Sequence, residues 1–83
     1  MSAAGDVVKA IATALVDHSD VVEVSVHESR GEVRITVATK PGDLGKLIGR
    51  GGRTASAVRV IAGIAAEREG QRATVDFEDG VQG

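Results

Sequence analysis

Hydrophobic and polar residues alternate in two neighbouring stretches in the first half of the chain. Within residues 21–28, VVEVSVHE, Val22, Val24 and Val26 alternate with polar residues. Residues 32–40, EVRITVATK, repeat the alternation with Val33, Ile35 and Val37. A period of two with β-branched residues predicts strands that each have one buried face. Because only SRG separates the two stretches, we expect them to form a hairpin.

The stretch before this hairpin has the spacing of a helix. Residues 6–18, DVVKAIATALVDH, place Val8, Ile11 and Leu15 at i, i+3 and i+7, with polar residues on the other sides. This pattern predicts an amphipathic helix, with its N-cap at Ser2 or at Gly5–Asp6.

Two further helices are predicted on either side of a run of glycines. Pro41 ends the second strand, and Asp43 is expected to cap a short helix that stops at the glycines. A longer helix follows from Arg53 to about Glu69, and Gly70 stands in the usual position after a helix end. The apolar residues of the short helix are Leu44, Leu47 and Ile48.

A third strand, residues 72–79 with the sequence RATVDFED, completes the order α-β-β-α-α-β. Two helices connect the second and third strands, so these strands should pair in parallel, with residues 33–39 in the centre of a three-stranded mixed sheet. Every strand has one apolar side, so all three helices should cover one face of this α+β fold. The opposite, solvated face is expected to carry Glu23, Ser25, His27, Arg34, Thr36, Lys40, Thr74, Asp76 and Glu78.

The length of 83 residues allows a single domain, 1–83, with a core over about residues 4–79 and a frayed tail at 80–83. The chain has no cysteine, which excludes disulfides and argues against a cysteine-rich zinc site. No apolar stretch approaches membrane-spanning length and no signal-peptide pattern is present, so we expect a cytoplasmic protein without a membrane partner. His18 and His27 lack the neighbours of a metal or catalytic site, so we predict no metal, no cofactor and no enzymatic activity.

Basic residues are concentrated in one part of a chain whose net charge is −2. Residues 40–59 contain five bases and one acid, and the rest of the chain contains five bases and eleven acids. A basic patch on an acidic body attracts an anion to one place.

The glycine run lies inside this basic segment. Two helices that meet at a Gly-x-x-Gly turn expose backbone N–H groups and the N-terminus of the second helix, which both favour negative charge. Gly49 and Gly52 lack the Cβ atoms that would keep a sugar-phosphate backbone away. Arg50 and Arg53 supply forked donors for phosphate oxygens, and Lys46 lies one turn earlier.

Residues 47–61, LIGRGGRTASAVRVI, resemble the Ile-Gly-x-x-Gly signature of KH domains, with Gly49-Arg50-Gly51-Gly52 as the loop. The element order is that of the type II, bacterial KH fold, and the resemblance covers Ala4 to Asp79. A free-standing KH domain of this size is similar to the small KhpA family of bacterial RNA-binding proteins.

The resemblance implies that the loop clamps the backbone of about four nucleotides of single-stranded RNA. Bases would then lie in a groove between the helices and the third strand. The resemblance also implies an RNA chaperone that acts with a larger KhpB-like KH-domain partner in post-transcriptional control, linked to cell elongation and envelope synthesis. The residues implied in RNA binding are Lys46, Ile48, Gly49, Arg50, Gly51, Gly52 and Arg53. The residues implied at the groove floor are Ile48, Val58 and Val75, with Ile61 as a further candidate.

The long helix carries more apolar surface than one sheet can cover. Its apolar residues spread over roughly 200°, about twice the ~100° of an amphipathic surface helix. We expect the part around Val60, Gly63 and Ile64 to stay exposed in a monomer and to form the interface of a two-fold homodimer. The alternative is that the first helix covers the extra arc.

Other glycine-rich motifs do not fit. A P-loop needs a Lys-Ser/Thr pair that GRGGRT lacks, and a dinucleotide-binding fingerprint follows a strand, whereas here a helix precedes the glycines. Phe77 is the only aromatic residue, which excludes RNA-binding folds built on an aromatic stacking platform. The remaining alternative is a protein–protein interaction module whose glycine-rich loop is only a structural turn.

Overall fold

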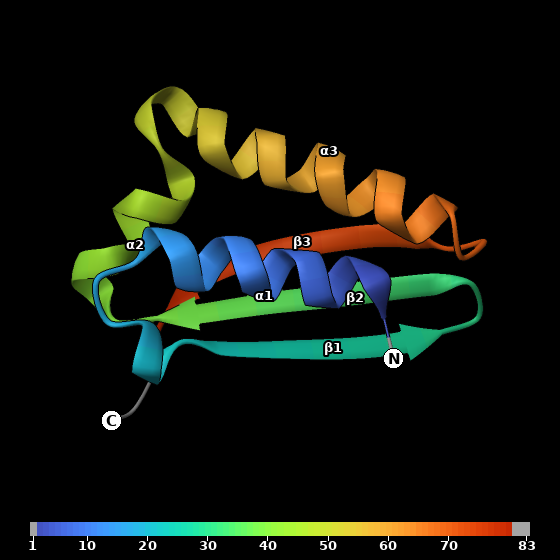
Figure 1. Cartoon of the computed structure of the whole chain (residues 1–83), viewed down its shortest axis with the longest axis horizontal. Helices are drawn as coiled ribbons and strands as arrows, with labels where there is room; N and C mark the ends of the chain where they lie inside the picture. Colours follow the sequence, from blue (N-terminus) through green and yellow to red (C-terminus); the bar gives the residue numbers. More distant parts are fainter. Residues whose placement is uncertain (1, 81–83) are drawn as a thin grey trace.

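The computed structural model describes residues 2–80 and contains the predicted three-stranded sheet in the order β1-β2-β3 (Figure 1). Strand β1 (Glu23–Ser29) pairs antiparallel with β2 (Glu32–Thr39), and β2 pairs in parallel with β3 (Arg72–Asp79). The turn between β1 and β2 consists of Arg30 and Gly31, both at positive φ, as in the type I′ turn of a two-residue hairpin. The hairpin, the central position of β2 and the parallel crossover are therefore confirmed.

Three helices and two short 3₁₀ turns complete the fold of residues 2–80. The helices are α1 (Ala3–Leu15), α2 (Pro41–Ile48) and α3 (Arg53–Glu67), and the turns are η1 (Ser19–Val21) and η2 (Arg50–Gly52). Helices α1 and α3 pack side by side and run in opposite directions, and α2 lies at one end of the molecule (Figure 1).

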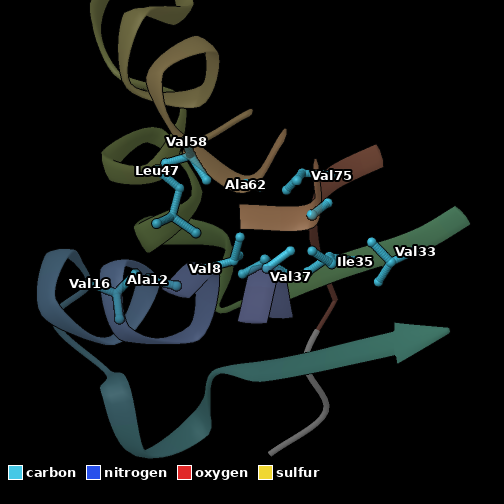
Figure 2. Packing of buried hydrophobic residues seen from close by; sticks show 12 residues of the cluster. Val8, Ala12, Val16, Val33, Ile35, Val37, Leu47, Val58, Ala62 and Val75 are labelled. Atoms are coloured by element: carbon cyan, nitrogen blue, oxygen red, sulfur yellow. The ribbon is translucent and has the colours of Figure 1, made fainter. Parts of the chain in front are cut away.

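The core lies between the helices and one face of the sheet, as predicted for this α+β fold. Val33, Ile35 and Val37 of the central strand are at most 1% exposed. The buried residues of all three helices join them in one cluster, which places the helices on the same face (Figure 2). The cluster consists of Ala4, Val8, Ala12, Val16, Val33, Ile35, Val37, Leu47, Val58, Ala62, Ala66 and Val75.

The first helix occupies Ala3–Leu15 rather than the predicted 6–18. Ser2 is its N-cap, and its hydroxyl accepts a hydrogen bond of 3.0 Å from the N–H of Gly5. The buried face consists of Ala4, Val8 and Ala12, spaced four residues apart, together with Gly5, whereas Leu15 is exposed. Small residues let α1 approach its neighbours closely, so Val8 is buried, whereas Ile11 and Leu15, the other two residues of the predicted periodicity, mark the edge of the buried face.

The short helix starts earlier than predicted. Lys40 is the N-cap of α2 and Pro41 is its first residue, a position where the missing N–H of proline costs nothing. The expectation that Asp43 caps this helix is wrong. Asp43 lies inside the first turn, and its side chain is only 2% exposed because it forms contacts outside the helix.

Helix α3 ends as the sequence predicts. Gly70 has φ +71, its N–H donates to the carbonyl of Glu67, and the N–H of Gln71 donates to that of Ala66. This pair of hydrogen bonds closes a helix end through a left-handed glycine. Of the tail expected at 80–83, residues 81–83 lie outside the described part of the chain.

Candidate nucleic-acid interface

The glycine run forms a tight turn between α2 and α3. Gly49, Gly51 and Gly52 have φ values of +75, +64 and +75, in the region that residues other than glycine rarely occupy. The N–H of Gly52 donates to the carbonyl of Gly49 at 3.0 Å. Gly52 is the N-cap of α3 and brings no side chain to cap it. The turn therefore leaves the positive end of a fifteen-residue helix without a side-chain acceptor.

The packing of Thr54 leaves no room for a side chain at Gly49. A Cβ atom at Gly49 would collide with the side chain of Thr54 and would lie 2.9 Å from its backbone nitrogen. Nothing lies within 4 Å of a Cβ built at Gly51 or Gly52. The first glycine thus permits close packing of α3 on the turn. Only Gly51 and Gly52 present a bare backbone to the surroundings. The packing of Thr54 is a structural reason for glycine at position 49, in addition to the expected approach of a phosphate.

Arg50 and Arg53 flank the two open glycines. Both residues are exposed, and neither guanidinium forms an ion pair within residues 2–80. Forked donors without a carboxylate partner, next to an uncapped helix N-terminus, form a surface that attracts phosphate.

Lys46, by contrast, has carboxylate partners in the protein. Its Nζ lies 2.9 Å from Oδ2 of Asp17 and 3.5 Å from Oδ1 of Asp43. The hydrogen bond and attraction to Asp17 raise the pKa of Lys46. Its role in RNA binding stays a prediction, and these two acids would have to release it first.

A hydrogen-bonded cluster fixes the position of α2, which leads into the turn. The backbone N–H of His18 donates to Oδ2 of Asp43, and His18 Nδ1 lies 2.9 Å from the same oxygen. Burial alone would raise the pKa of Asp43, but the hydrogen bonds from His18 outweigh burial and lower this pKa from 3.8 to about 2. Asp43 is therefore a buried carboxylate that joins the segment after α1 to α2.

The residues expected at a groove floor are not arranged as a floor. Val58 and Val75 are buried in the core, and no pocket opens anywhere within residues 2–80. Ile61 is two residues from Arg59, hence about 160° away around the helix axis, and the side chain of Arg59 forms a hydrogen bond to β3. Ile48 is half-buried and adjoins the turn, so it alone of the four keeps a place beside the expected RNA.

The outer side of α3 has the exposed apolar residues that the helical wheel predicts. Val60, Ile61 and Ile64 are 62%, 42% and 55% exposed. Gly63 is partly exposed, and nothing lies within 4 Å of a Cβ built there. Helix α1 packs against α3 but leaves this side open, so the alternative in which α1 covers the whole arc is wrong.

Two contacts near the interface were not predicted from the sequence. Arg59 links α3 to β3, and His18 links the segment after α1 to Asp43. The concentration of bases in residues 40–59 includes Arg59 but does not show its partner.

No helix among the described residues has the length and apolarity to cross a bilayer. No group of three potential metal-ligating side chains occurs in the same part of the chain.

Comparison with known proteins yields a family and several relatives. Residues 5–77 match the family described as KhpA/KhpB, KH domain. A protein of Halalkalibacterium halodurans named RNA-binding protein KhpA is 43% identical over 72 residues, which cover 87% of this chain and 95% of that protein. Its namesake from Caldanaerobacter subterraneus is 42% identical over 88% of this chain and 97% of its own length. The namesake from Aquifex aeolicus is 38% identical over 93% of this chain and 98% of its own length. No solved structure gave a significant match.

Proposed function

Because this chain belongs to the KhpA/KhpB family of KH-domain proteins, we propose that it binds single-stranded RNA through the turn between α2 and α3. The observation that carries this proposal is the pair Arg50 and Arg53, which form no ion pair among the described residues and surround two glycines whose Cβ positions are open. The names of the relatives, which are RNA-binding proteins, support it.

The proposed contact is to the sugar-phosphate backbone. Gly51 and Gly52 let a phosphate approach the main chain, the N-terminus of α3 adds its dipole, and the two guanidinium groups donate to phosphate oxygens. Such a clamp holds about four nucleotides with little sequence preference of its own. The net charge of −2 weakens binding elsewhere on the surface.

We further propose that α3 mediates a homodimer. Val60, Ile61 and Ile64 share one side of the helix, opposite to its buried residues. Gly63 beside them allows close approach of a second backbone. A two-fold axis would bury this side of α3 against its own copy.

The family resemblance also supports a larger KhpB-like partner, an RNA-chaperone role in post-transcriptional control, and a link to cell elongation and envelope synthesis.

Salt dependence tests the clamp against the alternative of a purely structural turn. If Arg50 and Arg53 neutralise two phosphates, the logarithm of the association constant should fall with the logarithm of salt concentration with a slope of roughly −1.4. The measurement is fluorescence anisotropy of a labelled single-stranded oligonucleotide over a range of sodium chloride concentrations. Absence of binding at low salt, or binding that salt does not weaken, would favour the interaction module.

A further inference from the structure

The side chain of Arg59 crosses from α3 to the outer strand of the sheet. Its Nε donates a hydrogen bond of 3.1 Å to the backbone carbonyl of Val75, and its Cζ lies 5.5 Å from the centre of the Phe77 ring. The second distance is within the range of a cation–π interaction. Among the strands that the structure describes, β3 pairs with β2 alone. Two contacts from one strand thus fix the orientation of this guanidinium.

The far end of the guanidinium stays available. Arg59 is exposed, and Val75 is its only hydrogen-bond acceptor among the residues that the structure describes. No carboxylate forms an ion pair with it in the same residues. Because Nε is occupied, the remaining donors on Nη1 and Nη2 form a fork that no described residue engages.

The position of this fork relates it to the proposed clamp. Arg59 follows Gly52 by seven residues, so it lies roughly 10 Å further along the α3 axis. This distance is short enough for a strand of RNA held at the turn to pass over Arg59. The absence of a pocket between α3 and β3 means that a base would meet this side chain at the surface.

We propose that Arg59 is a specificity-determining residue that selects guanine or cytosine at the nucleotide passing over it. A fixed guanidinium fork matches two adjacent acceptors. Guanine offers O6 and N7, and cytosine offers O2 and N3. Adenine places an amino donor beside N7, and uracil places N3–H between its two carbonyls. The inference rests on the proposed RNA binding, to which it adds a base preference that the backbone clamp cannot provide.

The competing explanation is that Arg59 only joins α3 to β3. Arg59→Lys separates the two, since lysine keeps the positive charge and the long stem but has no fork and no Nε donor. A joining role predicts a change in thermal stability and no change in base preference. Arg34→Lys is the matched control, because Arg34 is an exposed arginine on the opposite face of the sheet.

The test uses four labelled RNA hexamers: hexauridine and three versions with adenosine, cytidine or guanosine at the two central positions. Anisotropy titrations compare the parent protein, Arg59→Lys and Arg34→Lys. We expect the parent and Arg34→Lys to bind the cytidine or the guanosine hexamer at least roughly fivefold more tightly than the other sequences. Arg59→Lys should bind all four equally. Whichever of cytidine and guanosine is preferred identifies the edge that is contacted.

Other outcomes overturn the inference. Equal binding of all four hexamers by the parent, or an unchanged preference in Arg59→Lys, rules out base selection by Arg59 while RNA binding stands. If the parent binds none of them, the proposed function fails together with the inference. Should Arg59→Lys not fold, judged by circular dichroism, Phe77→Leu replaces it. This change removes the ring that orients the guanidinium, so it should at least halve the preference.

Discussion

The backbone N–H and the imidazole Nδ1 of His18 meet the same carboxylate oxygen, Oδ2 of Asp43, each at 2.9 Å. The two residues are 25 positions apart in the sequence, and their contact holds α2 against the segment that follows α1. Because α2 leads directly into the glycine turn, this contact supports the proposed RNA-binding surface from behind.

Asp43→Ala should lower thermal stability clearly. The change leaves the N–H of His18 without its acceptor and removes a carboxylate from both His18 and Lys46, and unpaired buried polar groups destabilise a fold. The check is the midpoint of thermal unfolding followed by circular dichroism. Asp20→Asn, at an exposed acid in η1, serves as the control and should leave the midpoint within error. Equal midpoints for Asp43→Ala and the parent would show that the contact does not hold the fold together.

Acid should weaken the protein through the same residue. The pKa of Asp43 is about 2 in the folded chain and 3.8 without the fold, so the unfolded chain takes up the proton first as the pH falls. The stabilisation from Asp43 is therefore complete above pH 3.8 and is lost as the pH falls towards about 2. Asn at position 43 cannot titrate. The difference in denaturant midpoint between the parent and Asp43→Asn should shrink over this range, and a constant difference would contradict the assignment.

The glycines of the turn should differ in how they tolerate alanine. Gly51→Ala only places a side chain on a left-handed backbone, which should lower the unfolding free energy by about 1–2 kcal/mol. Gly49→Ala adds a collision with Thr54, so its loss of unfolding free energy should be at least twice as large. Chemical denaturation of both variants measures the difference. Similar losses at the two positions would mean that the packing of Thr54 on Gly49 is not needed for the fold.

The apolar side of α3 should respond to a buried charge. Ile64→Glu, with Val60→Glu as a second variant, should shift the protein from dimer to monomer, because a glutamate buried in an apolar interface pays a large desolvation cost. Sedimentation velocity at tens of micromolar, about the range in which a weak dimer forms, gives the readout. Ala14→Glu, on an exposed position of α1, is the control and should remain dimeric. A parent protein that already sediments as a monomer would refute the proposed interface.

Alternation and turn chemistry were sufficient to predict the sheet. Residues 72–79 match β3 to the residue, and the helix end at Gly70 follows from glycine alone. The exposed side of α3 was also predictable, since its apolar arc exceeds what one sheet covers. These features depend on residues that are close together in the sequence, so the sequence alone is enough to predict them.

The sequence is least informative where a residue acts through a distant partner. Asp43 resembles a helix cap, but His18, 25 residues earlier, accounts for its burial. Lys46 belongs to the basic segment, yet Asp17 engages it. Val58 and Val75 were assigned to a groove by family pattern, whereas the packing of α3 on the sheet buries both. No local pattern carries such information.

One double variant tests the central claim most directly. Arg50→Asp combined with Gly51→Asp places two negative charges where phosphates are expected, at exposed turn positions with no packing role. Aspartate tolerates the left-handed backbone of Gly51 comparatively well, so the circular dichroism spectrum should be unchanged. Anisotropy titration with a labelled single-stranded RNA should then show binding at background level. A folded double variant that binds RNA as tightly as the parent would contradict the assignment of this turn as the RNA-binding site.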